Sequence, residues 1–440
     1  MDIPIYEKLT EHHNQNRISF AMPGHKNMRT LTINPCICDV TELSETLNLL
    51  DFDNPTTAKA NRLLSKLYQT RESFILTCGS TSCIQAMILG VLNAGDTLLA
   101  SSDCHISVIN ICAVAGIRLK LTNSFQELDT DGVSAVLVTS PNYYGVTKDI
   151  QQISHICRNK GIPLLVDEAH GAHFLGKCGL PQSAAVQGAD IVCHSAHKTL
   201  NAFTGASYLH ICTDRVDISR IKRCICAVHT SSPSYIIAAS ADFARASLCE
   251  CDYSDIINEC MEFKRVIGER TEICVLKNDD ATRIVLDFKN YNITGFEVDR
   301  MLSERYCIDI EMADASNIIL IATPQNRHSD FINLYHALLK ITESLDVKTE
   351  NKELIKPKCP AGIIEPQNGM FARTERIRLC DAEGRVSAVT VCMYPPGTAI
   401  IVMGQRIGHR EIEYISELEN MGAKINGLNA GTIEVIICVE

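Results

Sequence analysis

Short apolar runs alternate with helix-favouring stretches over residues 70–210, and this alternation limits the fold more than any other feature. The apolar runs are Phe74–Cys78, Thr97–Ala100, Ala135–Thr139, Leu164–Val166 and Ile191–Cys193. The helix-favouring stretches are Ser82–Leu92, Ile106–Ala115 and Asp149–Lys160. This order predicts a mostly parallel sheet with helices on both faces. Strands that are buried on both faces are expected to read as continuous apolar runs.

A lysine follows the last of these runs. The segment Ser195-Ala196-His197-Lys198 forms a predicted loop, and an apolar strand ending near Leu209 comes next. Desolvation lowers the pKa of an amine, and the neutral amine is the form that attacks an aldehyde. Lys198 therefore suits Schiff-base chemistry, although most lysines in loops of this kind are simply solvated.

Asp167 ends the apolar strand in PLLVDEAHGAHF (163–174). Pyridoxal phosphate (PLP) needs a carboxylate beside its ring nitrogen to keep that nitrogen protonated. In parallel α/β sheets such groups lie at the carboxyl ends of strands. The letters DEAH also occur in nucleic-acid helicases, but those enzymes require an upstream phosphate loop G-x-x-x-x-G-K-[S/T], which this chain lacks.

A phosphate site is predicted at Gly79-Ser80-Thr81-Ser82, after the first apolar run. The glycine permits a tight turn, the hydroxyls donate hydrogen bonds, and a helix N-terminus favours an anion. An ordinary helix cap is the alternative, but Asp167 and Lys198 favour the phosphate. In the next turn His105 suits either stacking on the pyridine ring or a capping or core role, and both interpretations stay open.

Together these residues resemble the Orn/Lys/Arg decarboxylases, PLP enzymes of the aspartate-aminotransferase fold (fold type I). The similarity extends nearly end to end, and the combination of DEAHGAHF, SAHKTL and YPPG is highly specific. The matching segments are MPGHK (22–26), TEL (41–43), CGSTSCIQAMI (78–88), SPNYYGVTKDI (140–150), LLVDEAHGAHF (164–174), SAHKTL (195–200), SSPSYIIAASADFARA (231–246), EMAD (311–314), GRVSA (384–388) and YPPG (394–397).

The resemblance implies a role for each candidate residue. Lys198 would form the Schiff base, Asp167 would pair with the pyridine nitrogen, and His105 would stack on the ring. His170 is expected near the ring and its phenolic oxygen. The residues expected to hold the cofactor phosphate are Ser80, Thr81, Ser82, Ser195 and His197, with Ser232 reaching the phosphate of a neighbouring subunit. That last role implies a homodimer with shared active sites, or a higher oligomer built from it.

Three positions depart from the family pattern. Ile106 stands where a lysine usually follows the stacking histidine, and Gly205 stands where a glutamine often follows Thr204. After YPPG, Met403-Gly404-Gln405 replaces the common proline, glycine and glutamate triplet. Loss of that glutamate puts recognition of a distal substrate cation in doubt.

The resemblance implies decarboxylation of arginine, lysine or ornithine to the corresponding amine, which would feed polyamine metabolism. PLP would accept the electrons of the breaking bond, and Cα would regain a proton from Lys198 or a nearby histidine. An arginine that grips the α-carboxylate would disfavour its loss, so we expect an apolar setting there and acidic groups further out. Another PLP reaction, such as that of a lyase or aminotransferase, is the alternative, followed by a non-catalytic regulatory homologue.

Composition narrows the partners of the chain. Its net charge of −11 over 440 residues, without a basic cluster, argues against nucleic acid and membrane partners. Asp2 and Glu7 are unlike the start of a signal peptide, so we expect a cytoplasmic protein whose 21 cysteines are free thiols. Close cysteine pairs such as Cys36/Cys38 have one-residue spacing, unlike structural zinc sites, and we predict no metal.

The chain divides into four predicted parts. Residues 1–35 form an N-terminal arm that packs on a partner subunit, and residues 36–265 form the PLP-binding large domain. Residues 266–350 form a small α/β domain, with strands at Thr282–Phe288 and Ile318–Ala322 and helices at Gly295–Tyr306 and Asp330–Leu345. A linker near Lys348–Pro366 leads into a C-terminal α+β domain over residues 351–440.

Overall fold

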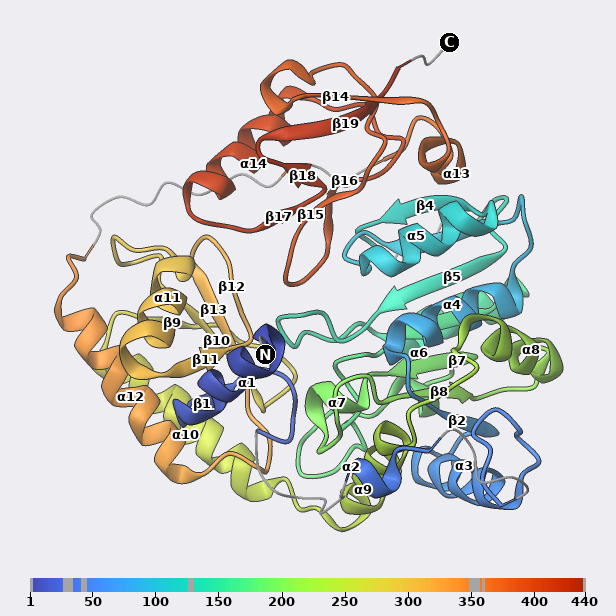
Figure 1. Ribbon diagram of the computed structural model, residues 1–440, viewed down its shortest axis with the longest axis horizontal. Helices are drawn as coiled ribbons and strands as arrows, with labels where there is room; N and C mark the ends of the chain where they lie inside the picture. Colours follow the sequence, from blue (N-terminus) through green and yellow to red (C-terminus); the bar gives the residue numbers. More distant parts are fainter. Residues whose placement is uncertain are drawn as a thin grey trace.

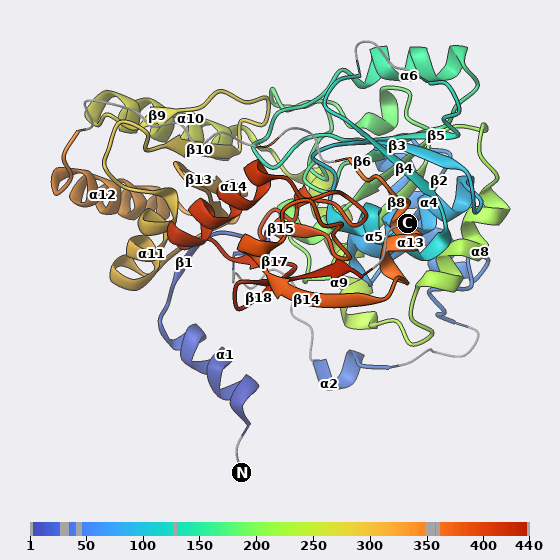
Figure 2. The same ribbon diagram turned by 90° about the horizontal axis from the view of Figure 1, so that it is seen from above.

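A computed structural model describes residues 3–26, 35–40, 46–125, 130–347, 357 and 361–437. The TEL segment (41–43) and most of the predicted linker lie outside these residues. Figures 1 and 2 show a large α/β domain beside a smaller one, with a C-terminal domain that reaches across both. In the described part of the chain, no helix combines the length and the apolar character needed to cross a membrane.

The large domain contains a seven-stranded, mostly parallel sheet, which confirms the predicted architecture. Its strand order is β2-β8-β7-β6-β5-β3-β4, and only β8 runs antiparallel to its neighbours. The strands are β2 (Glu72–Leu76), β3 (Thr97–Ser101), β4 (Arg118–Thr122), β5 (Ala135–Thr139), β6 (Leu164–Asp167), β7 (Ile191–His194) and β8 (Ser207–Ile211). The apolar pattern missed β4 because this edge strand exposes Arg118 and Lys120.

Helices cover both faces of this sheet. One face of the central strands packs with α4 (Gly79–Val91), α5 (Ile106–Ala115) and α8 (Ile218–Val228). On the other face, Val136, Val138 and Val166 pack with α6 (Ile150–Asn159). Near β2 and β8, α3 (Pro55–Tyr68) and α9 (Tyr235–Glu250) extend the core. Burial on both faces explains why the inner strands read as uninterrupted apolar runs.

The small domain is an antiparallel sheet packed on three helices. Its strand order is β12-β13-β10-β9. The strands are β9 (Cys274–Val275), β10 (Arg283–Asp287), β12 (Met312–Ala313) and β13 (Asn317–Ile321), and the helices are α10 (Ser254–Arg270), α11 (Gly295–Tyr306) and α12 (His328–Glu343). The predicted boundary at residue 265 falls inside α10. Helix α10 packs on α12 and β10, and the position of the boundary stays a prediction.

Only part of the N-terminal segment packs against the rest of the chain. Strand β1 (Ile18–Phe20) pairs in parallel with β11 (Ile308–Ile310) of the small domain. Helix α1 (Pro4–Asn14) buries no residue and projects from the molecule in Figure 2. Residues 18–20 therefore pair with a strand of the same chain, while the packing of α1 on a partner subunit stays a prediction.

The C-terminal domain contains two three-stranded sheets, ordered β14-β19-β18 and β16-β15-β17. Its elements are α13 (Pro366–Met370), β14 (Thr374–Arg378), β15 (Val391–Met393), β16 (Ala399–Ile401), α14 (His409–Asn420), β17 (Ile425–Asn426), β18 (Leu428–Asn429) and β19 (Thr432–Ile436). The loop between β15 and β16 descends between the other two domains in Figure 1. There the amide N of Ile106 donates to the carbonyl O of Gly397 at 3.1 Å.

Candidate active site

A cavity of about 1670 Å³ lies where the three domains meet. Residues from the carboxyl ends of strands in the large sheet form much of its wall, as expected for an open parallel sheet. The predicted site residues that line it are Ser80, Thr81, His105, Asp167, His170, Ser195, His197 and Lys198. Two predicted residues, Ser82 and Ser232, do not line it.

The sequence predicts a loop at Lys198, but this residue lies in the short helix α7 (Ala196–Thr199). Its Nζ atom lies 3.0 Å from Nε2 of His170 and 6.0 Å from the ring centre of Tyr143. Burial lowers the pKa of the Lys198 amine, partly offset by the nearby Asp167 carboxylate. Burial also holds the pKa of His170 well below its ordinary value, and the positive charge of Lys198 adds to this effect. The lowered pKa makes the neutral, nucleophilic form of the Lys198 amine easier to reach than in an exposed lysine.

Asp167 ends strand β6 and is 3% exposed. Its Oδ1 atom accepts hydrogen bonds from the amide N of Ala169 at 3.1 Å and from Sγ of Cys193 at 3.5 Å. Among the described residues it forms no ion pair with a lysine, arginine or histidine. A buried carboxylate without such a partner is costly unless a ligand supplies the missing donor.

Hydroxyl groups gather at the N-terminus of α4, which begins at Gly79 and not at Ser82 as predicted. Ser195 Oγ donates to Ser80 Oγ at 2.7 Å, and Ser80 and Thr81 both face the cavity. Nδ1 of His197 donates to the carbonyl O of Ala206 at 3.0 Å. A helix of 13 residues whose first turn opens on hydroxyl groups is suited to hold a phosphate.

Ser82 and Ser232 do not face the cavity and have other hydrogen-bond partners. Ser82 Oγ donates to the carbonyl O of Gly79 at 2.8 Å, within the first turn of its own helix. Ser232 is exposed on the surface of this chain, where its amide N donates to Thr230 Oγ1 at 3.2 Å. Its predicted contact with a neighbouring subunit stays a prediction.

His105 has the capping role, one of the two that the sequence left open, and its stacking on a cofactor ring stays a prediction. It is the N-cap of α5, where its Nδ1 accepts from the amide N of Ser107 at 3.2 Å. Its ring also faces the cavity and lies against the β15–β16 loop, because a Cβ atom on Gly397 would come within 3.2 Å of His105 Cδ2. Burial lowers its pKa, so the neutral ring is favoured.

Sequence reasoning gave no role to several residues that complete the site. The Tyr143 hydroxyl donates to Oε1 of Glu311 at 2.5 Å, and the amide N of Met22 donates to Oε2 at 2.8 Å. The ring centres of Tyr143 and His170 lie 4.5 Å apart. Tyr143 and Glu311 belong to the segments SPNYYG and EMAD, so the only signal in the sequence was their presence in shared motifs.

The sequence of this chain matches the models of a known protein family. The description "Orn/Lys/Arg decarboxylase, major domain" matches residues 3–119 and 117–287, and "Orn/Lys/Arg decarboxylase, C-terminal domain" matches residues 365–434. The chain belongs to the Orn/Lys/Arg decarboxylase family. An arginine decarboxylase of Bacillus subtilis (strain 168) is 27% identical and is matched over 100% of this chain and 98% of its own length. A second protein of that strain, described as uncharacterized protein YaaO, is 31% identical over 97% of this chain and 96% of its own.

Solved structures confirm the predicted fold. A lysine decarboxylase of Francisella novicida matches with a TM-score of 0.75 and 16% identity, over 98% of this chain and 83% of that chain. An alanine–glyoxylate aminotransferase from Nostoc sp. matches with a TM-score of 0.55 and 15% identity, over 74% of this chain and 95% of that chain. The aspartate-aminotransferase-like fold is therefore shared with both kinds of enzyme.

The departures of this decarboxylase from its family pattern have distinct surroundings. Gln405 does not line the cavity, and its Oε1 accepts from the amide N of Val402 at 3.0 Å within the C-terminal domain. Gly205 does line the cavity, and its φ of +97° is a value that other residues rarely adopt. Ile106 starts helix α5 beside the β15–β16 loop.

The charged groups around this decarboxylase cavity are mostly acidic. The lining carboxylates among the described residues are Asp103, Asp167, Asp287, Glu297, Glu311 and Asp314. Lys198 and Lys289 are the lining lysines, and no arginine lines the described part of the wall. The balance of charge suits a ligand with a cationic side chain.

Proposed function

We propose that this chain is a PLP-dependent decarboxylase that converts arginine, lysine or ornithine to the corresponding amine and so serves polyamine metabolism. One observation carries the proposal: the Lys198 amine, the Asp167 carboxylate and the Ser80–Ser195 hydroxyls face a single cavity. Relatives that carry the name arginine decarboxylase match the whole chain, which makes arginine the first substrate to test.

The residues present fit PLP. Lys198 would hold the aldehyde carbon covalently, and Asp167 would meet the pyridine nitrogen, whose N–H would supply the donor that this buried carboxylate lacks. Ser80, Thr81, Ser195 and His197 would hold the phosphate, and His105 would lie on the ring. When bound, PLP supplies an electron sink for the pair of electrons left by the departing carboxylate.

The side chains of the cavity would perform the rest of the reaction. The absence of arginine from the described lining leaves the α-carboxylate without a bidentate partner that would resist its departure. The acidic lining would attract the cationic end of the substrate. Lys198 Nζ, once released, is placed to move a proton, and burial lowers the pKa of its amine.

We also propose a cytoplasmic homodimer in which Ser232 completes the site of the partner subunit. Two features support this proposal. Ser232 is exposed on this chain, and helix α1 presents Ile5 and Leu9 at 79% and 64% exposure, as expected of surfaces that a second copy covers. Size measurement with and without PLP would test it.

The deciding experiment combines cofactor capture with a product assay. Purified protein is incubated with PLP, reduced with borohydride and digested, and mass spectrometry should find the pyridoxyl adduct on Lys198. Carbon dioxide release is then measured from arginine, lysine and ornithine, and one of the three should be strongly preferred. Formation of a keto acid without carbon dioxide would instead identify an aminotransferase, and absence of any adduct would contradict the cofactor assignment.

A further inference from the structure

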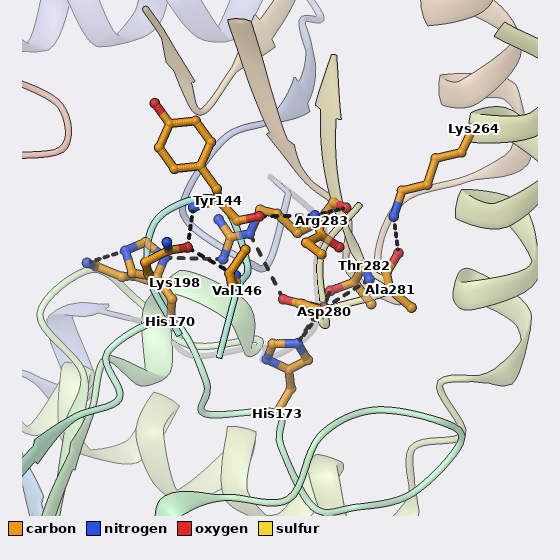
Figure 3. A network of polar contacts seen from close by, with 12 residues as sticks. Tyr144, Val146, His170, His173, Lys198, Lys264, Asp280, Ala281, Thr282 and Arg283 are labelled. Atoms are coloured by element: carbon orange, nitrogen blue, oxygen red, sulfur yellow. Dashed lines mark hydrogen bonds and ion pairs between the residues drawn. The ribbon is translucent and has the colours of Figure 1, made fainter. Parts of the chain in front are cut away.

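A chain of buried polar side chains continues behind the cavity wall from Lys198 to His173 (Figure 3). Nη2 of Arg283 lies 3.2 Å from Nδ1 of His170, on the side of the ring opposite Lys198. Nε of Arg283 lies 4.0 Å from Oδ2 of Asp280, whose Oδ1 lies 3.2 Å from Nε2 of His173. Arg283 and Asp280 are 1% and 0% exposed, and neither lines the cavity.

The direction of the hydrogen bonds follows from the chemistry of arginine. A guanidinium group has only donors and stays charged in proteins, so His170 Nδ1 must accept from Arg283. The neutral ring then carries its single proton on Nε2, which faces Lys198 Nζ at 3.0 Å. Since Nε2–H donates, the Lys198 amine must accept with its lone pair. This arrangement fits the neutral form of Lys198.

Arg283 is fixed in place from two sides. Its stem packs against the turn after β5, where a Cβ atom on Gly145 would come within 2.9 Å of Arg283 Cβ. The carbonyl O of Gly145 also accepts from the amide N of Asp280 at 3.1 Å, which ties the large domain to the small one. Asp280 itself is fixed by Thr282, whose amide N and Oγ1 donate to its Oδ1 at 3.0 and 2.7 Å.

Packing alone does not explain this arginine. Its Nε and Nη1 atoms are buried and have no hydrogen-bond partner among the described residues. A buried guanidinium that is only partly satisfied costs free energy, and apolar residues of similar volume often replace buried ion pairs without loss. The only hydrogen bond that the Arg283 side chain makes among the described residues is the one to His170.

We propose that Arg283, held by Asp280, is a positioning residue that fixes His170 as the Nε2–H tautomer and keeps its ring neutral. His170 then serves as a hydrogen-bond donor to Lys198 and not as a general acid or base. The other charged or titratable groups around it are Lys198, His105, His197 and Tyr143. The charge of the Arg283 guanidinium opposes a proton on His170 Nδ1.

This assignment selects the proton donor of the proposed reaction, and in that respect it rests on the proposed function. Loss of carbon dioxide leaves Cα short of one proton. His170 holds a single proton, and giving it up would leave an imidazolate beside neutral Lys198. The neutral Lys198 amine can first accept a proton and then give that same proton up as an ammonium group, which returns it to the neutral amine. The sequence left these two donors open, and the geometry favours Lys198.

The test uses protein without PLP, so that it is independent of turnover. The full-length chain is labelled with ¹⁵N-histidine, and His170 signals are assigned by their loss in His170→Gln. Two-bond ¹⁵N–¹H spectra are recorded across the pH range in which ordinary histidines titrate. We expect an Nε2–H pattern that does not change with pH. A protonated ring or an Nδ1–H tautomer in the wild type would overturn the proposal without any variant.

Variants separate positioning from simple structural support. Arg283→Met should let His170 titrate and mix its tautomers, whereas Arg283→Lys keeps a charged donor and should preserve the wild-type pattern. Arg215→Met is the matched control. It removes an arginine whose Nη1 lies 3.1 Å from Oδ2 of buried Asp190, and neither residue lines the cavity. An unchanged His170 pattern in Arg283→Met would overturn the proposal. If that variant fails to fold, Asp280→Asn provides the same comparison through weaker positioning of Arg283.

A kinetic readout connects the tautomer to the reaction. In the PLP-loaded enzyme, Arg283→Met should lower kcat and add an acidic limb to its pH profile where His170 titrates, and Arg283→Lys should restore the profile. A normal His170 pattern in protein that decarboxylates none of the three amino acids would contradict the proposed function alone. Loss of kcat without any change in the pH profile would contradict the positioning role.

Discussion

Asp167 and Lys198 reach one cavity from neighbouring parallel strands. Strands β6 and β7 pair so that Asp167 lies opposite Cys193, and Lys198 lies in α7, the short helix that follows β7. The carboxylate and the amine therefore come from adjacent strand ends and face a common ligand. Their relative placement follows from the pairing of β6 and β7, whose residues are all buried.

Replacing Lys198 tests its role as the covalent anchor. Lys198→Ala should abolish turnover and the visible absorbance of the PLP-loaded enzyme, because Lys289 is the only other lysine in the described lining and Lys198 is the one that contacts His170. Spectra and carbon dioxide assays on the same preparation give the result. Lys289→Ala is the control, since Lys289 lines the same cavity but pairs with Asp287 at 3.6 Å. That variant should keep the absorbance, and decarboxylation by Lys198→Ala would contradict the mechanism.

Asp167 should matter more to rate than to folding. Asp167→Asn removes the charge that would keep the pyridine nitrogen protonated but retains an oxygen that can accept from Ala169 and Cys193. We expect kcat to fall by at least about a hundredfold, the usual scale for loss of a placed electrostatic group. The Tm should change little. A large loss of Tm with kcat unchanged would assign Asp167 to the fold instead.

Glu168, the neighbour of Asp167, gives the fold a pH dependence. It is 2% exposed and lies 2.6 Å from Nε2 of His194. Burial raises the pKa of Glu168 to about 8, and burial lowers the pKa of His194 to about 3. The folded chain therefore keeps a proton on Glu168 at pH values where the unfolded chain, with a pKa near 4.5, has released it.

The sign follows from this difference. The stabilisation that protonated Glu168 gives the folded chain is fully present below about pH 4.5. It is lost as the pH rises to about 8, and the free energy of unfolding then falls by up to about 1.4 kcal/mol per pH unit. Glu168→Gln should flatten this decline in urea titrations at a series of pH values. His194 acts in the opposite direction, with stability lost as the pH falls from 6.5 to about 3. Glu250→Gln, on the surface, is the control and should leave the profile unchanged.

The sequence predicted the large domain well because its signals are local. Strand β5 (Ala135–Thr139) and helix α5 (Ile106–Ala115) have the predicted bounds, since burial on both faces and a clear cap mark them. Strand β4 was missed because an edge strand alternates exposed charge with partly buried residues. The local sequence pattern also failed to predict the helix at Lys198. A helix of one turn is too short to show the helical repeat of apolar residues.

The site was predicted only where each residue follows its own strand. Asp167 and Lys198 carry such a signal, but Arg283 and Glu311 do not, because they come from the small domain more than 80 residues later. Arg283 reads as a strand residue, and only the packing of β10 behind His170 gives it a role. Side-chain partners that tertiary packing brings together leave no periodic pattern in the sequence.

Gly205 should tolerate no side chain, although the family often has glutamine there. Its φ is +97°, and a Cβ atom would come within 3.1 Å of the carbonyl O of Thr77. Its own carbonyl O accepts from the amide N of Gly79 at 2.8 Å, so any shift moves the start of α4 and the predicted phosphate site. Gly205→Ala should therefore lower both stability and PLP affinity.

The matched control separates backbone strain from the loss of space. Gly161 has a φ of +70°, and nothing lies within 4 Å of a Cβ atom there. Gly161→Ala should cost about 1 kcal/mol of unfolding free energy from backbone strain alone and leave PLP affinity unchanged. Gly205→Ala should cost more than this and weaken PLP binding, as measured by urea unfolding and by titration of the visible absorbance. Equal losses of stability in the two variants, with PLP affinity unaltered in both, would show that the contact with Thr77 and the Gly79 hydrogen bond do not hold the phosphate site in place.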